Sequence, residues 1–496
     1  MVDASQDNVT ISRKQYQELL QTRVEFERLK EELANLKRML YGQKRERFIP
    51  TDSQQLSIFS PQEAVVENVE PQVEQVSYER NKPKKKGKAV RMELPANLPR
   101  KEEIIEPEDL PQEARKIGQE ITEVLEIEPA KVSVRRIIRP KYALPLDQGI
   151  VIAPLPDDLP LPRSNASASA LAHISVAKFV DHLPWHRINK QLKRSNLFLP
   201  ESTLQGWFKQ SCELLLVLYE LLRKQLLSST YLQMDESPLK VLDKDKPGAT
   251  HQGYMWVANA PELRLVLFEY APSRAAKVAE GILEDFQGTL QTDGYSAYDR
   301  FEQQEGLLLV ACMAHIRRKF DQALDNDRQR ASHVLKQIGL LYQIEERARE
   351  EHMTAEQRQA LRQKEALPIF TDLHQWLDKQ YDLLTPKSSI AKAVSYALQM
   401  FPRMAHYLQD GRIEIDNNLI ENKIRPLALG RKNYLFAGNH EAAQRNAIMY
   451  SLLGSCLVNN RDPYVWLTNT LLKINSTKAS ELYTLLPNYN PESHKV

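Results

Sequence analysis

Residues 415–440 read IDNNLIENKIRPLALGRKNYLFAGNH, and this stretch carries two carboxylates, Asp416 and Glu421, among several asparagines. Four cations follow them, namely Lys423, Arg425, Arg431 and Lys432. A carboxylate flanked by amides and cations suits a site for a metal ion and a phosphate. A capped surface helix with ion pairs would use the same residues, so the rest of the chain has to decide between the two interpretations.

Helical spacing brings the polar residues of this stretch together. If residues 416–425 are helical, Asn418, Glu421 and Arg425 share one face, because surface neighbours on a helix lie three and four positions apart. Pro426 should then end or kink the helix, since the residue before a proline disfavours the α conformation. Asp416 would occupy the N-cap, where a carboxylate oxygen accepts the first free N–H groups.

Three runs rich in apolar, β-branched and aromatic residues begin at Thr230 and predict an antiparallel meander. They cover residues 230–242, 253–260 and 264–271. A helix over 273–286, strands over 288–293 and 307–313 and a helix over 314–324 are expected to follow. Asp235 lies in the first strand, and Asp293 ends the fourth. An aspartate at a strand end is common, so neither residue alone indicates a site.

Together with Glu421, the two aspartates change the interpretation. The order β-β-β-α-β-α, with acids on the first strand, after the fourth and on a late helix, is typical of a ribonuclease H-like domain. We therefore expect an α/β fold with a mixed sheet and a large helical insertion at about residues 327–410. Adjacent central strands would bring the three acids together. Hard oxygen ligands of this kind suit Mg²⁺ or Mn²⁺, and cations would offset their mutual repulsion.

The first 92 residues have a different character. Residues 1–48 carry an a/d seam typical of a short coiled coil, which favours a homo-oligomer over a helix packed on its own chain. The seam consists of Leu19, Phe26, Leu29, Leu33, Leu36 and Leu40. Residues 49–92 are poor in apolar residues and predict a disordered basic linker. Its lysines Lys84, Lys85 and Lys86 could contact phosphates or could simply be solvated.

Two further regions precede the meander, and one follows residue 440. Residues 93–160 carry short alternating segments that suggest strands. Residues 161–228 predict three helices, and we expect this region to contact DNA, although an ordinary helical subdomain would carry similar residues. The candidate DNA contacts there are Arg187, Lys190, Lys193 and Arg194. Residues 229–440 would form the catalytic domain, and residues 441–496 a C-terminal helical segment.

Four motifs resemble those of the insertion sequence 66 family of transposases. They are QMDESP (233–238), TDGYSAY (292–298), AHIRRKF (314–320) and the long motif at 416–438. The resemblance implies a DDE transposase of a bacterial insertion sequence, with Asp235, Asp293 and Glu421 as catalytic acids that hold two Mg²⁺ (or Mn²⁺) ions. Such an enzyme cuts element ends and joins them to target DNA. Groups suited to positioning phosphates are Lys319, Arg425, Arg431 and Lys432.

One departure from the family concerns cysteine. Family members usually carry a small cysteine zinc module around the motif that is RPKYA (139–143) here, but this chain has no cysteine before Cys212. We therefore expect no zinc, and a degenerate module over 93–160. The three cysteines are far apart, and no C-x-x-C occurs, which also argues against a disulfide framework.

The composition is compatible with this function. The formal net charge is only +2 with 27% charged residues, so basic side chains must act through local patches. No signal peptide or membrane span is evident, which predicts a cytoplasmic, nucleoid-associated protein. The expected partners are double-stranded DNA, namely terminal inverted repeats and target, further copies of the chain and possible accessory proteins. Alternatives are a catalytically inactive protein that binds DNA ends and a ribonuclease H-like nuclease or resolvase.

Overall fold

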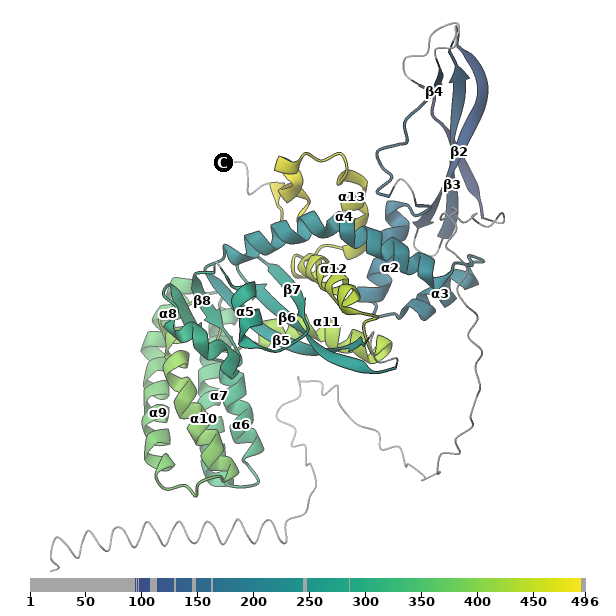
Figure 1. Cartoon of the computed structure of the whole chain (residues 1–496). Coiled ribbons are helices and arrows are strands. Elements are labelled where there is room, and N and C mark those ends of the chain that lie inside the picture. Colours follow the sequence, from purple (N-terminus) through teal and green to yellow (C-terminus); the bar gives the residue numbers. More distant parts are fainter. Residues whose placement is uncertain are drawn as a thin grey trace, which may run out of the picture. The chain divides into compact units, whose positions relative to one another are not determined.

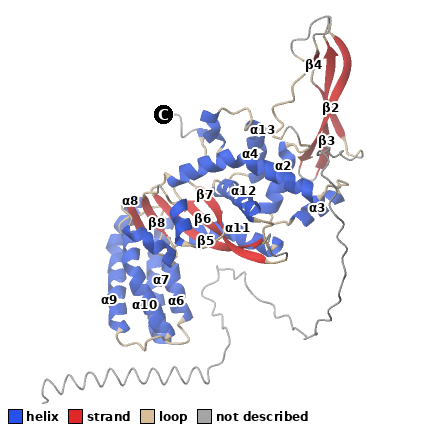
Figure 2. Cartoon of the chain, in the orientation of Figure 1, coloured by secondary structure: helices blue, strands red, loops and turns tan. Residues whose placement is uncertain are grey.

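The central element of the computed structural model is a five-stranded mixed sheet with the strand order β7-β6-β5-β8-β9 (Figure 2). The structure describes residues 94–491, except 95, 97, 108–113, 129–130, 145–148, 162–163, 244–247 and 285. Contacts divide the chain between Arg91 and Met92, and every described residue lies in the second unit. The predicted coiled coil (1–48) and the basic linker (49–92) lie outside the described residues.

The first three strands of this sheet confirm the predicted antiparallel meander. They are β5 (Tyr231–Leu242), β6 (Thr250–Ala260) and β7 (Leu265–Ala271). The last two, β8 (Gly288–Gln291) and β9 (Leu307–Val310), run parallel to β5. The mixed sheet expected from the sequence is therefore present, and β5 and β8 are direct neighbours.

The outer strand β7 is protected along its open edge by helix α12 (His440–Val458). Ser451 Oγ accepts a hydrogen bond from Phe268 N at 2.7 Å, and Ser455 Oγ accepts one from Val266 N at 3.0 Å. The serines are four residues apart, so both face the strand. They satisfy backbone groups that an uncovered edge would expose to pairing with another chain.

Helices make up nearly all of the segment between β9 and α11 (Figure 1). They pack around a second apolar core, which Tyr231 of β5 and Val310 of β9 also join. Phe370, Phe401 and Leu341 are among its buried residues. The helices are α6 (Met313–Gln322), α7 (Arg328–Glu350), α8 (Ala355–Leu361), the π-helical turn η3 (Arg362–Ala366), α9 (Leu367–Tyr381), α10 (Ser389–Met404) and η4 (Ala405–Leu408).

Helix α11 (Asn418–Tyr434) contains Pro426 in its interior, so of the two predicted effects of this proline, an end or a kink, the end is wrong. A proline removes one helical hydrogen bond, but packing on both sides of it outweighs that loss. Ile420 and Leu427 are fully buried in the apolar core that also contains residues of β5, β6 and β7. The N-cap is Asn417 rather than Asp416.

The region between residues 94 and 160 forms a second sheet with no cysteine in it. Its strands are β1 (Arg100–Ile104), β2 (Arg115–Glu128), β3 (Lys131–Ala143) and β4 (Ile150–Ile152). Val124, Ile137 and Leu159 form a small apolar cluster, and Arg100 Nε lies 2.9 Å from Glu123 Oε1. Apolar packing and ion pairs therefore contribute to this β-unit.

The remaining elements flank the central sheet. They are α2 (Ala168–Phe179), α3 (Trp185–Arg194), α4 (Glu201–Leu227), α5 (Ala276–Ile282), η2 (Ser296–Gln303), α13 (Pro463–Lys473) and η5 (Ala479–Leu485). The three helices predicted within residues 161–228 are confirmed by α2, α3 and α4. None of the helices in the described ranges is both long and apolar enough to span a membrane.

Candidate active site

The register between β5 and β8 brings two of the predicted acids, Asp235 and Asp293, to corresponding positions on neighbouring strands. Gln233 pairs with Gln291 in this parallel pair, and each strand continues with a Gln-x-Asp sequence. Asp235 and Asp293 therefore follow the paired glutamines by the same two residues. Gly294, with φ of +82°, allows the chain to turn after Asp293, since a Cβ there would lie 2.8 Å from Met400 Sδ.

Glu421, in the first turn of α11, faces the cationic face of α6. Its Oε1 lies 3.6 Å from Arg318 Nη2 and 3.9 Å from His315 Nε2. Burial and the Arg318 guanidinium lower the pKa of His315, whereas Asp293 and Glu421 act in the opposite direction. His315 therefore lies beside Glu421 at the start of α11, and the negative charges of Asp293 and Glu421 favour its protonated form.

The electrostatics of Asp235 link all three predicted acids. Burial raises its pKa to about 8, and the negative charges of Asp293, Glu236 and Glu421 add to the increase. Within the described part of the chain, no group of three or more His, Cys, Asp and Glu side chains lies at metal-binding spacing. Glu421 is paired with Arg318 of α6, and like charges on the three acids repel one another. The donor set, carboxylates short of positive charge, fits a hard divalent cation.

Asp235→Asn should stabilise the protein in the absence of divalent cations, increasingly so as the pH rises. Because the pKa is raised on folding, the protonated carboxyl favours the folded state fully below about pH 4, and this contribution is lost as the pH rises through about 8. The neutral amide avoids that loss. We expect a gain on the order of 1–2 kcal/mol near pH 8, reduced by solvent screening.

Thermal denaturation of the wild type and Asp235→Asn at about pH 5 and about pH 8, with chelator and with Mg²⁺, measures this effect. Mg²⁺ should stabilise the wild type at the higher pH but have little effect on the variant. An equal difference between the two proteins at both pH values would contradict the expectation.

A buried polar network beneath the aspartates was not anticipated from the sequence. Gln291 Oε1 accepts hydrogen bonds from Tyr231 Oη at 2.6 Å and Gln233 Nε2 at 3.0 Å. Gln291 Nε2 donates to the Glu414 carbonyl at 2.8 Å, and Asn259 Nδ2 donates to Gln233 Oε1 at 3.1 Å. The network ties β5, β6 and β8 to the segment that leads into α11. The repeated Gln-x-Asp sequence was the signal that could have revealed it.

Asp416 is engaged in holding the start of α11. Its Oδ1 accepts the Asn418 N–H at 3.0 Å, and its Oδ2 accepts bonds from Tyr342 Oη at 2.8 Å and Asn418 Nδ2 at 2.6 Å. Only 7% of Asp416 is exposed. Asp416 therefore caps α11 as predicted, but from the position before the N-cap residue Asn417. Its hydrogen bond with Tyr342 of the helical insertion was not predicted.

Glu236 is a further acid beside Asp235 that sequence reasoning missed. Its carboxylate forms an ion pair with Arg274 and accepts a hydrogen bond from Tyr298 Oη at 2.9 Å. The Arg274 guanidinium stacks 3.7 Å from the ring of Tyr295. Tyr295 N in turn donates to Asp293 Oδ1 at 2.8 Å. Glu236, Arg274 and Tyr295 therefore link the residue next to Asp235 with Asp293.

The predicted phosphate-positioning cations differ in their surroundings. Lys319, Arg425 and Lys432 are exposed, and the Lys319 ammonium lies 5.4 Å from the Tyr396 ring centre. Arg431 instead braces α11 against β5, since its Nη1 donates to Ser237 Oγ and the Pro238 carbonyl, both at 2.7 Å. On α3 the four candidate DNA contacts, Arg187, Lys190, Lys193 and Arg194, are all exposed. Lys84, Lys85 and Lys86 lie outside the described residues.

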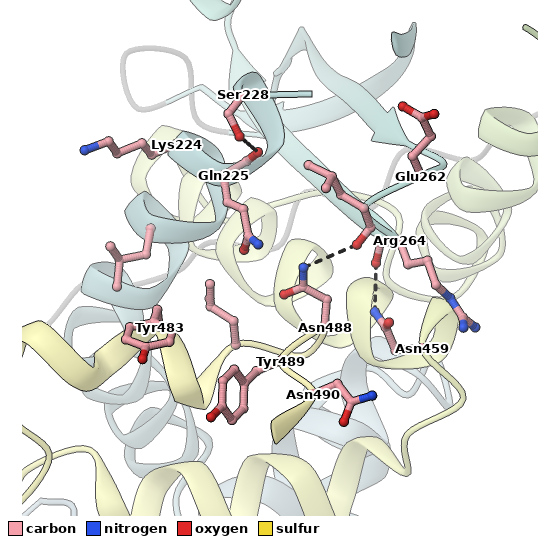
Figure 3. Close-up of a pocket in the computed structure, with 13 residues that line it drawn as sticks. Lys224, Gln225, Ser228, Glu262, Arg264, Asn459, Tyr483, Asn488, Tyr489 and Asn490 are labelled. Atoms are coloured by element: carbon pink, nitrogen blue, oxygen red, sulfur yellow. Dashed lines mark hydrogen bonds between the residues drawn. The ribbon is translucent and has the colours of Figure 1, made fainter. Parts of the chain in front are cut away.

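A pocket of about 570 Å³ opens between the end of α4, the β6–β7 turn and the C-terminal segment (Figure 3). Lys224, Arg264, Asn459 and Tyr489 are among its lining residues, and none of the three predicted acids belongs to the lining. The candidate active site is therefore the meeting point of β5, β8, α6 and α11, and this pocket is separate from it.

Comparison with known proteins gives the family. The profile described as Transposase IS66 family matches residues 163–445, and the one described as Transposase C of IS166 homeodomain matches residues 28–102. The chain is 34% identical over 417 residues to Uncharacterized protein y4jD of Sinorhizobium fredii, covering 79% of this chain and 81% of that protein. It is 32% identical over 421 residues to Uncharacterized protein y4qI of the same organism, covering 80% and 77%. The chain therefore belongs to the IS66 family of transposases.

Proposed function

We propose that this protein is the transposase of a bacterial insertion sequence, which cuts the element ends and joins them to target DNA. The observation that carries the proposal is the parallel register of β5 and β8, which places Asp235 within β5 and Asp293 just after β8, each two residues beyond the paired glutamines. Glu421 of α11 adds to the negative charge that raises the pKa of Asp235. The strand order, with an antiparallel meander followed by two parallel strands, supports a ribonuclease H-like catalytic domain.

Asp235, Asp293 and Glu421 are the residues that would hold two Mg²⁺ or Mn²⁺ ions. Bound there, the cations would supply positive charge for the attacking and leaving oxygens of an in-line displacement. Arg318 restrains the Glu421 carboxylate from the side of α6. The Glu236–Arg274 ion pair and the hydrogen bond between Gln233 and Gln291 restrain the backbone on which Asp235 and Asp293 lie. The protein thus contributes three carboxylates, from β5, the turn after β8 and α11.

Two displacements at phosphorus make up the proposed reaction. Water attacks the phosphorus at the element end, breaks its bond to the 3′ oxygen and releases a 3′ hydroxyl. That hydroxyl then attacks the phosphorus of a target phosphodiester, which joins the element to the target and releases a 3′ hydroxyl of the target strand. Exposed Lys319, Arg425 and Lys432 would hold the DNA backbone at the site, while the exposed cations of α3 would hold it further away. Arg431 would act indirectly by fixing α11 on β5.

The test uses the full chain, labelled duplexes of the element ends and a target plasmid, with Mg²⁺ or Mn²⁺. We expect a cut end with a 3′ hydroxyl and a joined product. Binding without cutting would favour an inactive end-binding protein, and cutting of branched DNA without joining would favour a nuclease or resolvase. Inverted repeats bounded by short direct duplications in the DNA flanking the gene would support the transposase independently.

The coiled coil expected over residues 1–48 gives a separate prediction. Replacing Leu29 and Leu36 with lysine should convert the full-length protein to a monomer, because charged a/d positions cannot pack in the seam. End pairing should be lost with it. Sedimentation velocity of the wild type and the double variant measures the change, and unchanged sedimentation would contradict a coiled coil. Glu31→Lys, which lies outside the seam, is the matched control.

A further inference from the structure

The turn after α11 presents two large apolar side chains to solvent. Leu435 is 62% exposed and Phe436 is 41% exposed. Leu435 adopts φ of +65° and ψ of −42°, and Phe436 N donates to the Tyr434 carbonyl at 2.7 Å. This is the geometry of the rare γ-turn that strains any residue with a side chain. Glycine would adopt it more easily, so a leucine here is a costly way to make a turn.

The turn is rigid because residues on both sides of it are anchored. Before it, Tyr434 Oη lies 2.7 Å from Tyr450 Oη, and Asn433 Nδ2 donates to the His182 carbonyl at 3.0 Å. After it, Ala437 pairs with β5, since Ala437 N donates to the Lys240 carbonyl at 2.8 Å. The exposed residues Leu435 and Phe436 thus lie between two anchored residues, Tyr434 and Ala437.

Two lysines lie near this apolar tip. Lys432 precedes it on α11, and Lys240 lies beside Ala437 on β5, both with exposed side chains. An apolar tip next to cations does not match a second apolar protein surface, but it matches DNA, whose phosphates meet the cations and whose bases offer apolar faces.

We propose that Leu435 and Phe436 form a wedge that enters between two base pairs of the bound DNA and unstacks them. This inference rests on the proposed function. The 17-residue helix α11 carries Glu421 near its start and the wedge at its end, so the two lie about 20 Å apart at about 1.5 Å per residue. With α11 lying along the duplex, and at about 3.4 Å per base pair, the wedge would meet the DNA about six base pairs from the cut.

The decisive variant is Leu435→Gly, which removes the side chain while fitting the backbone. Its thermal stability should equal or exceed that of the wild type, yet cleavage of element ends should fall at least about tenfold, as expected for the loss of one stacking contact. Phe436→Ala should lower cleavage similarly. Leu472→Ala, at an exposed leucine of α13, is the control and should cleave normally.

Two DNA measurements complete the test. With 2-aminopurine placed along the end duplex, wild-type protein should raise the fluorescence at about the sixth base pair from the cut, and Leu435→Gly should not. A mismatch at that step should restore cleavage by the variant, which a merely structural defect would not allow. Normal cleavage by Leu435→Gly, or no fluorescence change with bound wild type, overturns the wedge alone. Failure of the wild type to bind the ends in a gel shift overturns the proposed function and the wedge with it.

Discussion

Glu421→Gln is expected to lower cleavage of element ends by a factor on the order of 10³ or more while end binding persists. Glu421, in the first turn of α11, lies 3.6 Å from Arg318, and its negative charge contributes to the raised pKa of Asp235. The amide keeps the shape of the side chain but removes the charge that a cation ligand and the Arg318 contact both need. Cleavage of labelled ends with Mg²⁺ or Mn²⁺, measured beside a gel shift, gives both quantities.

Asp416→Asn is the matched comparison, five residues earlier in the same stretch. It should keep most of the cleavage activity, because Asp416 holds Tyr342 and the start of α11 and is not aimed at the strand acids. The amide accepts fewer of these hydrogen bonds, so we expect a stability loss of about 1 kcal/mol. An inactive Asp416→Asn together with an active Glu421→Gln would reverse the assignment.

Arg362→Ala is expected to destabilise the protein by about 3–5 kcal/mol, the range for removing one partner of a buried ion pair. The side chain is fully buried, and all five of its N–H groups are used. Nε and Nη2 bind the buried Glu345 carboxylate at 2.7 and 2.9 Å. The others donate to the carbonyls of Tyr407, Asp410 and Ile413 at 2.6 to 2.8 Å.

Those carbonyls lie on the segment that leads from the helical insertion to α11, so loss of Arg362 should also misplace Glu421. Urea denaturation measures the stability, and the cleavage assay at a temperature where the variant is folded measures the second effect. Arg347→Ala is the control, since its ion pair with Glu365, at 2.6 Å, is partly exposed and screened by solvent, so its loss should destabilise the protein much less. Equal losses in the two variants would contradict the role assigned to Arg362.

Local patterns were enough to predict the strands and most helices of the described region. Alternating and β-branched runs predicted β5, β6 and β7, and helical periodicity predicted α2, α3 and α4, because each such pattern is read from residues adjacent in the chain. The motifs around Asp235, Asp293 and Glu421 identified the candidate acids and the family. The roles of those acids remain predictions that the cleavage assays test.

Tertiary contacts decided what local patterns could not. Pro426 lies inside α11 because Ile420 and Leu427 are buried on either side of it, and burial is a property of the whole fold. Glu236, His315 and Arg318 joined the site only when β5, β8, α6 and α11 came together. Arg362, an ordinary charged residue in the sequence, became a fully buried anchor because carbonyls some 45 to 51 residues away surround it. Interactions between distant residues depend on packing free energy summed over the core, and no short window of sequence contains that sum.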